Sequence, residues 1–338
     1  MNKYPLISII IPVFNRYVQL LRCIKSLQRQ RYPKDKIEIL VIDDGSSPAL
    51  KQTLLPPGVG LIRQIHQGDT AARNLGAAYA KGDLFFFTDS DCIVLPSALR
   101  KLYETLKKND ASAARGAYLN KSYKLVARFV QLDFEYRQEM LANSREVDLL
   151  DTACTLVRRN AFLAIGGFNP VIKVCGDVAF SYALRQKGYK LVFVPEARVY
   201  HQHSDSILSY LRNKCRKGIW RARVFQLYPK KLIHDSYTPQ SLKLQCLIVI
   251  ILSFLTILLL ILPYKKIISF FMLTFLISFL FSCLPFMIFT FRRDKVIGLL
   301  NPCFIFLRAL ALLSGSMFSL FSFSWDKQKY FIKNSTKK

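Results

Sequence analysis

The sequence is poor in acidic residues and has no closely spaced pair of cysteines. Only 22 of its 338 residues are Asp or Glu, against 49 Lys or Arg, so the formal net charge is +27. The eight cysteines form no Cys-x-x-Cys pair, which argues against both a zinc site and a disulfide framework. This cysteine usage fits a protein of a reducing compartment.

We also expect no signal peptide at the amino terminus. The short apolar stretch after Lys3 is interrupted by Pro12 and Asn15, before it reaches the length of a signal-peptide core. We therefore expect the amino-terminal domain to remain in the cytoplasm.

The last third of the chain contains three long runs that almost lack charge. They cover residues 244–262, 267–291 and 299–325, and only Arg308 interrupts the last of them. About 20 apolar residues suffice to cross a bilayer, so the sequence predicts a transmembrane region at 242–326 with two spanning helices. The third run either spans as well or lies in the membrane interface.

The basic residues gather beside these runs. A Lys-rich tail covers 327–338. A second cluster directly precedes the first run and consists of Arg212, Lys214, Arg216, Lys217, Arg221, Arg223, Lys230 and Lys231. Juxtamembrane clusters of this kind mark the cytoplasmic side and bind anionic lipid head groups. We therefore expect membrane lipids as partners, and no nucleic acid.

The segment at 207–241 leads into the apolar region. Its apolar positions up to residue 228 alternate loosely with basic ones, as in a basic amphipathic helix that lies on a membrane surface. The alternative is a solvated basic face packed on the preceding domain. If the first two runs form a spanning hairpin, Lys265 and Lys266 face outward and 292–295 returns to the cytoplasm.

The first two thirds of the chain read as alternating strands and helices. Apolar runs at 6–13, 37–42 and 85–87 each end at a polar turn, and leucines and isoleucine at 20–27 follow a helical spacing. This recurrence is typical of parallel β-α-β units, so the expected fold class is α/β. The carboxyl ends of such strands meet at one sheet edge, where ligands bind.

That edge would collect Asn15, Asp43, Asp44, Asp89 and Asp91. The last two carboxylates lie only two positions apart and would repel each other, and the usual remedy is a hard cation such as Mg²⁺ or Mn²⁺. The pair therefore predicts a metal and diphosphate site. It could alternatively cap the next helix, because Asp-x-Asp is common by chance.

Two further positions suit a nucleotide. Asp44 could accept a hydrogen bond from a base or ribose, or it could form a turn before Ser46. Gly68 starts a turn into an alanine-rich helix, whose free N–H groups, together with Arg73, suit a phosphate. Arg73 could equally be an ordinary surface arginine.

Four short motifs follow one another along the first hundred residues. They are Ile11-Pro12-Val13-Phe14-Asn15, Val41-Ile42-Asp43-Asp44-Gly45-Ser46, Gln67-Gly68 with Ala72-Arg73-Asn74-Leu75-Gly76, and Asp89-Ser90-Asp91. Their order and spacing resemble the family-two glycosyltransferases with the GT-A fold, over residues 5–225. The resemblance implies a Rossmann-like, mainly parallel sheet with helices on both faces, a catalytic domain at 1–206, and inverting transfer from a nucleoside diphosphate sugar.

The resemblance also implies a donor site. Asp44 would hold the base, whereas Asp89 and Asp91 would bind Mg²⁺ or Mn²⁺ and the diphosphate, which Arg73 would help to hold. Asp91 is the preferred metal ligand, and Asp89 would contact ribose or metal-bound water. The other expected donor-binding residues within these motifs are Pro12, Phe14, Asn15 and Gly68.

Downstream segments resemble the acceptor side of the family. These segments are Gly166-Gly167-Phe168-Asn169 and Cys175-Gly176-Asp177-Val178-Ala179-Phe180. Asp177 matches the family's general base, and Gly176 replaces its usual glutamate. In the family a histidine after the next strand can complete the metal shell. His201 fits that position best and His203 is the reserve, because alternating side chains point to opposite sides.

These features together predict a metal-dependent hexosyltransferase at the cytoplasmic face of the plasma or inner membrane. Its donor would be a nucleoside diphosphate sugar, with a UDP-linked donor favoured, and its acceptor a glycan or lipid-linked molecule in cell-envelope polysaccharide synthesis. The absence of Gln-x-x-Arg-Trp near 212–220 favours the addition of one or a few sugars. The alternatives are transfer to polyprenyl phosphate, which needs no base, and a nucleotide-sugar-binding membrane protein without activity.

Overall fold

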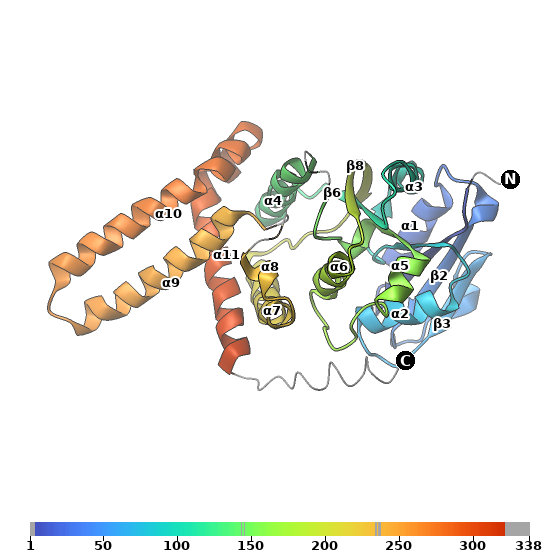
Figure 1. Cartoon of the computed structure of the whole chain (residues 1–338), viewed down its shortest axis with the longest axis horizontal. Helices are drawn as coiled ribbons and strands as arrows, with labels where there is room; N and C mark the ends of the chain where they lie inside the picture. Colours follow the sequence, from blue (N-terminus) through green and yellow to red (C-terminus); the bar gives the residue numbers. More distant parts are fainter. Residues whose placement is uncertain (1–3, 143, 145, 234, 236–237, 322–338) are drawn as a thin grey trace.

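The computed structural model describes residues 4–142, 144, 146–233, 235 and 238–321. Trp325 and the Lys-rich tail at 327–338 lie outside these residues. The described chain consists of an α/β domain and a group of long carboxyl-terminal helices that extends away from it (Figure 1).

A mixed sheet of eight strands forms the centre of the α/β domain. The strands are β1 (Ile7–Val13), β2 (Ile37–Asp43), β3 (Val59–Arg63), β4 (Leu84–Phe87), β5 (Ile93–Val94), β6 (Ala113–Leu119), β7 (Thr155–Arg158) and β8 (Leu191–Tyr200). Their order is β3-β2-β1-β4-β7-β6-β8-β5. The first four are parallel, β6 and β8 are parallel, and β7 and β5 run antiparallel to their neighbours. The predicted α/β fold with a mainly parallel sheet is confirmed.

Helices cover both faces of this sheet. The helices of the domain are α1 (Tyr17–Gln28), α2 (Asp69–Tyr79), α3 (Ala98–Lys108), α5 (Arg159–Ala164) and α6 (Gly176–Gln186). Apolar side chains of α1 and α3 join one buried cluster, and those of α2, α5 and α6 join the other. Single 3₁₀ turns occupy Lys34–Lys36, Gln52–Leu54 and Thr152–Cys154. The two clusters hold the sheet, and therefore its edges, in a fixed shape.

Strand β8 runs through Pro195 and Glu196. Its pairing with β6 is interrupted there, because the register shifts from Arg115 opposite Phe193 to Ala117 opposite Arg198. A proline without an N–H is tolerated at such an irregularity.

Further helices connect the domain to the carboxyl-terminal region. They are α4 (Leu125–Ala142), α7 (Ile207–Leu227), α8 (Lys230–Ile233), α9 (Gln240–Ile261), α10 (Lys265–Arg293) and α11 (Lys295–Phe321). A third buried cluster joins α4 to α9, α10 and α11 through residues such as Phe129, Val249 and Phe286. The long helices are thus packed onto the α/β domain through α4.

Three helices of the described chain, α9, α10 and α11, are long and apolar enough to cross a membrane. They correspond to the three apolar runs of the sequence. Figure 1 shows α9 and α10 side by side as a hairpin that points away from the α/β domain.

Candidate active site

The predicted polar edge exists, because the parallel strands all end on one side of the sheet. Val13, Asp43 and Phe87 are the last residues of β1, β2 and β4. The backbone N–H of Asp44 donates to the carbonyl of Val13 over 2.9 Å, so the loops after these strands meet. Asp89 follows β4 by two residues and therefore lies at the same edge.

The carboxylates of Asp89 and Asp91 face an imidazole there. Among the described residues, one ligand atom each of Asp89, Asp91, Cys92 and His201 lies within 4.8 Å of the others. Oδ1 of Asp91 is buried without a hydrogen-bond partner and lies 3.9 Å from Nε2 of His201. Two carboxylates and an imidazole are ligands that Mn²⁺ and Mg²⁺ accept, so the residues fit the predicted cation.

The other two candidate ligands fit less well. Burial raises the pKa of the Cys92 thiol well above its ordinary value, so the thiol stays protonated and is a poor ligand for a hard cation. The imidazole of His203 is buried instead against the ring of Phe134, and its Nε2 lies 3.0 Å from Oε1 of Gln131. Burial lowers the pKa of His203 to about 3. His203 is thus a neutral packing residue, and His201 is the better candidate.

Two arginines neutralise the paired acids. Nη2 of Arg73 lies 2.7 Å from Asp89, and its Nη1 lies 2.6 Å from Asp69 on the same helix. Arg73 is buried, and the two carboxylates raise the pKa of its guanidinium, which stays charged. Arg16, which is more exposed, forms an ion pair with Asp91. The acid cluster is therefore lined by cations that also suit a diphosphate.

Asp44 organises the loop that leads into α2. Its Oδ1 accepts from Nε2 of Gln64 at 2.6 Å and from the N–H of Gln67 at 2.8 Å. Its Oδ2 accepts from the N–H of Gly68 at 2.9 Å and lies 2.9 Å from Nδ1 of His66. These contacts use the four acceptor positions of a carboxylate. Gly68 has φ of 98°, a conformation that favours glycine.

The expected nucleoside contacts surround this loop. The ring of Phe14 is exposed and stacks on His66 with centroids 4.2 Å apart. Asn15, in the left-handed region with φ of 54°, accepts the N–H of Ser47 at 2.8 Å. A cavity of about 180 Å³ lies beside these residues, and Asn15 and Ser47 line it. Pro12 is buried within β1.

Asp177 lies in the first turn of α6, where its carboxyl has a raised pKa. Burial, followed by the nearby carboxylate of Asp151, raises its pKa to about 6, and Lys217 on α7 opposes the shift. Its carboxylate accepts the N–H of Val178 at 2.9 Å. A carboxylate with this pKa is ionised at neutral pH and takes up a proton more readily than an ordinary aspartate.

The segment before α6 is tied to α2. Asn74 donates from Nδ2 to the carbonyl of Phe168 over 2.7 Å and accepts the N–H of the same residue at 2.8 Å. Gly176, where a glutamate was expected, packs on Thr70 of α2. The first turns of α2 and α6 are therefore adjacent, which brings the donor-side and acceptor-side motifs together.

Comparisons with known proteins agree with this geometry. Residues 8–166 match the sequence model described as "Glycosyl transferase family 2". This segment belongs to that family. A mannosyltransferase from Pyrobaculum calidifontis, solved with GDP-Man and Mn²⁺, is similar with a TM-score of 0.60 and 15% identity. The similarity covers 95% of this chain and 88% of that protein, and it shows a shared GT-A-like fold.

Two curated relatives are more similar in sequence to this chain than that mannosyltransferase is. The glycosyltransferase AglE of Haloferax volcanii is 26% identical over 202 residues, which are 57% of this chain and 65% of AglE. The probable glycosyltransferase YdaM of Bacillus subtilis is 24% identical over 267 residues, which are 70% of this chain and 62% of YdaM. The chain thus spans less than two thirds of the length of these relatives.

Several contacts of the candidate site were not predicted from the sequence. Arg16 follows Asn15 at the end of β1, so its place at the edge was predictable but its pairing with Asp91 was not. The pairing of Arg73 with Asp69 had a signal, because acid and base are four residues apart on one helix. No sequence signal would have placed Asp151 near Asp177.

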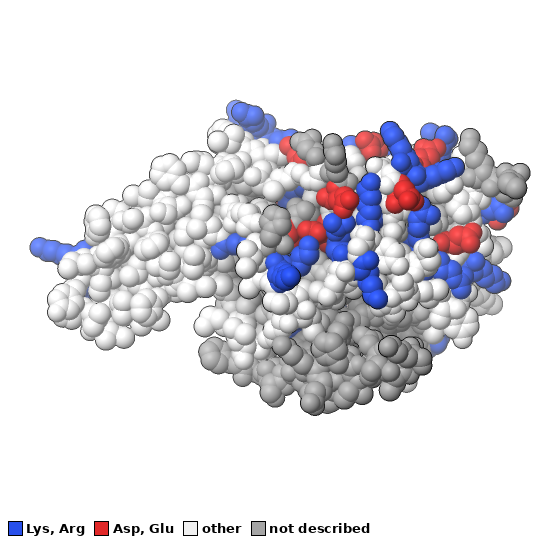
Figure 2. Space-filling view, in the orientation of Figure 1, with Lys and Arg blue, Asp and Glu red and all other residues white. Residues whose placement is uncertain are grey.

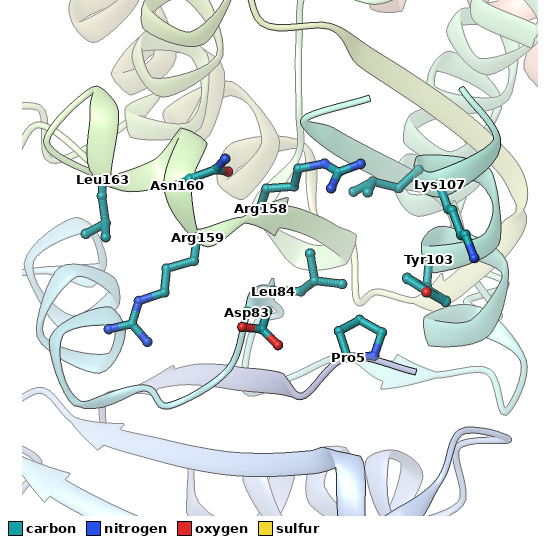
Figure 3. Close-up of a pocket in the computed structure, with 10 residues that line it drawn as sticks. Pro5, Asp83, Leu84, Tyr103, Lys107, Arg158, Arg159, Asn160 and Leu163 are labelled. Carbon is teal, nitrogen blue, oxygen red and sulfur yellow. The ribbon is translucent and has the colours of Figure 1, made fainter. Parts of the chain in front are cut away.

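A larger cavity lies at the opposite edge of the sheet. It measures about 710 Å³, and Pro5 and Asp83 line it just before the first residues of β1 and β4 (Figure 3). Arg158 and Arg159 lie on its other side. Because the acid cluster lies at the carboxyl ends of these strands, this cavity is separate from the candidate site.

Proposed function

We propose that the protein is an inverting, metal-dependent glycosyltransferase. It moves a sugar from a nucleoside diphosphate sugar to a glycan or lipid-linked acceptor of the cell envelope, at the cytoplasmic face of the membrane. The observation that carries the proposal is the meeting of Asp89, Asp91 and His201 at the carboxyl edge of a family 2 domain. The fold shared with a GDP-Man-bound and Mn²⁺-bound mannosyltransferase supports it.

The donor diphosphate would lie among the acids and arginines of this edge. Asp91, Asp89 and His201 would hold Mg²⁺ or Mn²⁺, which when bound neutralises charge on the leaving diphosphate. Arg73 and Arg16 supply positive charge at the same carboxylates. The leaving group gains negative charge during transfer, so fixed cations beside it stabilise the transition state.

The nucleoside would bind between Phe14, Asn15 and the loop that Asp44 organises. Phe14 offers an exposed ring for stacking, and the adjacent cavity has room for part of a base. Because the four acceptor positions of Asp44 are used within the chain, a contact to the base requires one of them to be exchanged. Of these, the contact to the more exposed His66 is the easiest to release.

Asp177 would act as the general base. Its carboxylate takes the proton of the acceptor hydroxyl, while the hydroxyl oxygen forms a bond to the anomeric carbon. The bond from that carbon to the phosphate oxygen breaks, and the nucleoside diphosphate leaves with the electron pair. Attack from the side opposite the leaving group inverts the anomeric centre. Such a base typically contributes about 10²- to 10⁴-fold in rate.

A phosphate-bearing lipid acceptor such as polyprenyl phosphate is the second candidate. An exposed lysine of α7 favours it, because Lys217 lies close enough to Asp177 to oppose the rise in the pKa of that carboxyl. An acceptor that already carries a negative charge needs no base. Asp177→Asn therefore separates the two candidates: transfer to a hydroxyl acceptor falls about 10²-fold or more, whereas transfer to a phosphate acceptor is retained.

A screen of UDP-linked and GDP-linked sugars tests the proposal. The detergent-extracted full chain is assayed for release of nucleoside diphosphate, with Mn²⁺ and with a chelator. We expect release from at least one donor that the chelator abolishes. A protein that binds a nucleotide sugar but releases no diphosphate with any donor and acceptor would be a sensor without activity, and the proposal would fail.

A further inference from the structure

The direction of α11 differs from that of the other two apolar helices. Figure 1 shows α9 and α10 as a hairpin pointing away from the α/β domain, while α11 runs crosswise at the base of the hairpin. At 1.5 Å per residue the 22, 29 and 27 residues of α9, α10 and α11 measure about 33, 43 and 40 Å. Each helix is long enough to span the bilayer, so length does not distinguish α11 from α9 and α10. Their directions do.

The hairpin has the surface of a membrane-embedded element. Phe254, Leu260, Phe270 and Phe281 are among its many exposed apolar side chains. Figure 2 shows no charge on the face in view between the base of the hairpin and its far end. Lys265 starts α10 at that far end. A surface of this kind is stable when the hairpin lies in the hydrocarbon of a bilayer and its charged far end reaches the water on the other side.

The base of the hairpin, by contrast, is held by ion pairs to α4. Arg293 pairs with Glu139 of α4 at 2.5 Å, and Asp294 pairs with Arg128 of the same helix. Charged pairs that are partly exposed belong in the aqueous or head-group layer. The bilayer therefore ends where α10 ends and α11 begins.

Helix α11 also packs against α4. Phe304 stacks on Phe129 of α4 with centroids 4.5 Å apart. The guanidinium of Arg308 is 2.8 Å from Asp133 of α4, and both side chains are buried. Of the residues in an apolar 18-residue stretch of each helix, 39% are buried in α11, against 17% in α9 and 17% in α10.

Farther along, α11 crosses α7 at very close range. A Cβ on Gly218 of α7 would lie 2.2 Å from the carbonyl oxygen of Leu312, and one on Gly315 would lie 2.0 Å from that of Cys215. Because α7 also carries exposed Arg212, it cannot lie within hydrocarbon. The half of α11 that is packed against it is therefore at the level of the membrane surface.

We propose that, of the described helices, only α9 and α10 cross the membrane, and that α11 lies in the plane of its cytoplasmic surface beside α7. The surface that it offers to the lipid consists of exposed apolar residues, among them Leu299, Met317, Phe318 and Leu320. Both ends of α11 are then on the side of the family 2 domain. Together α7 and α11 form a platform on which that domain rests against anionic lipid.

Protease protection in sealed membrane vesicles that expose the family 2 domain tests this topology. One variant carries a cleavage site appended after Lys338, and controls carry the same site before Met1 or between Lys265 and Lys266. We expect cleavage after Lys338 and before Met1 in intact vesicles, and cleavage between the two lysines only after detergent. Protection of the Lys338 site until detergent is added would show that α11 spans, and would overturn the proposal.

A second measurement uses a smaller change. Lys338→Cys and Arg212→Cys are made in a Cys303→Ser background, because Cys303 is exposed, and are treated with a membrane-impermeant maleimide. We expect both to be labelled in intact vesicles, and Lys266→Cys to be labelled only in detergent. Loss of Lys338→Cys labelling in intact vesicles, with recovery in detergent, contradicts the in-plane position. Neither readout depends on transferase activity, so a failure here leaves the proposed function standing.

Discussion

Gly176 lies so close to Thr70 that a Cβ at residue 176 would be 2.3 Å from Cγ2 of the threonine. The first turn of α6, which carries Asp177, is therefore packed directly on the first turn of α2, which follows the loop bound by Asp44. A side chain at residue 176 would therefore require Thr70 or the start of α6 to shift.

Gly176→Ala is expected to displace the start of α6 from α2. Overpacking of this kind costs about 1–3 kcal/mol, and the displacement of Asp177 should lower transfer more than donor binding. The double variant Gly176→Ala with Thr70→Ala removes the clashing methyl group and should recover most of the loss. Thermal unfolding and transfer rates of the two variants check this. If Gly176→Ala alone kept the wild-type transfer rate and stability, close packing of Gly176 on Thr70 would not matter and the prediction would be wrong.

The raised pKa of Asp177 predicts the pH dependence of activity. Transfer to a hydroxyl acceptor should fall as the pH drops through about 6, because the carboxylate is then protonated. Asp177→Asn should remove both the activity and this pH dependence. A transfer rate that is flat between pH 5 and 7, at saturating donor and metal, would exclude Asp177 as the base.

The same shift predicts an effect on stability. The folded protein binds this proton with a pKa of about 6, above the value of 3.8 for an ordinary aspartate. The folded state thus gains from protonation, so the stability due to this group is present below about pH 4 and is lost as the pH rises through 6. Asp177→Asn should therefore stabilise the protein at pH 8, by at most about 3 kcal/mol. Its melting temperature relative to wild type, compared at pH 8 and pH 4, checks the sign.

Arg16 and a divalent cation should compete for Asp91. Arg16→Gln removes the ion pair and should tighten Mn²⁺ binding a few-fold, since an exposed pair contributes about 1 kcal/mol or less. Arg22→Gln, an exposed change on the adjoining helix, is the matched control. Calorimetric titration with Mn²⁺ measures both. Weaker binding in Arg16→Gln alone would contradict this relationship.

The two histidines after β8 should have separable roles. His201→Ala should weaken Mn²⁺ binding by at least the roughly 10- to 100-fold that loss of an outer-shell partner costs. His203→Ala should leave Mn²⁺ affinity nearly unchanged and lower the melting temperature, because this ring packs on Phe134 and contacts Gln131. The reverse pattern would make His203 the ligand.

The acid pair could be located from the sequence alone because parallel strands place their carboxyl ends together. Asp89 and Asp91 follow a short buried strand, and that local pattern sufficed. His201 could be suggested by the family resemblance only. What brings it to Asp91 is the antiparallel pairing of Ile93 with Tyr200, a contact between segments more than 100 residues apart that no local pattern encodes.

The apolar helices show the same limit. Hydropathy identified all three runs because it depends on composition, yet it carries no information on direction. The crosswise position of α11 depends on Arg308 meeting Asp133 and on Gly218 meeting Leu312. These tertiary contacts support the proposal that α11, although apolar and long enough, does not cross the bilayer.

The central claim is that Asp91 belongs to a metal-dependent donor site. The most direct test is the rate of Mn²⁺-dependent nucleoside diphosphate release by Asp91→Ala, compared with the exposed control Asp35→Ala. We predict that release by Asp91→Ala falls to the level seen with a chelator, while Asp35→Ala keeps the wild-type rate. Wild-type, Mn²⁺-stimulated release by Asp91→Ala would contradict the account.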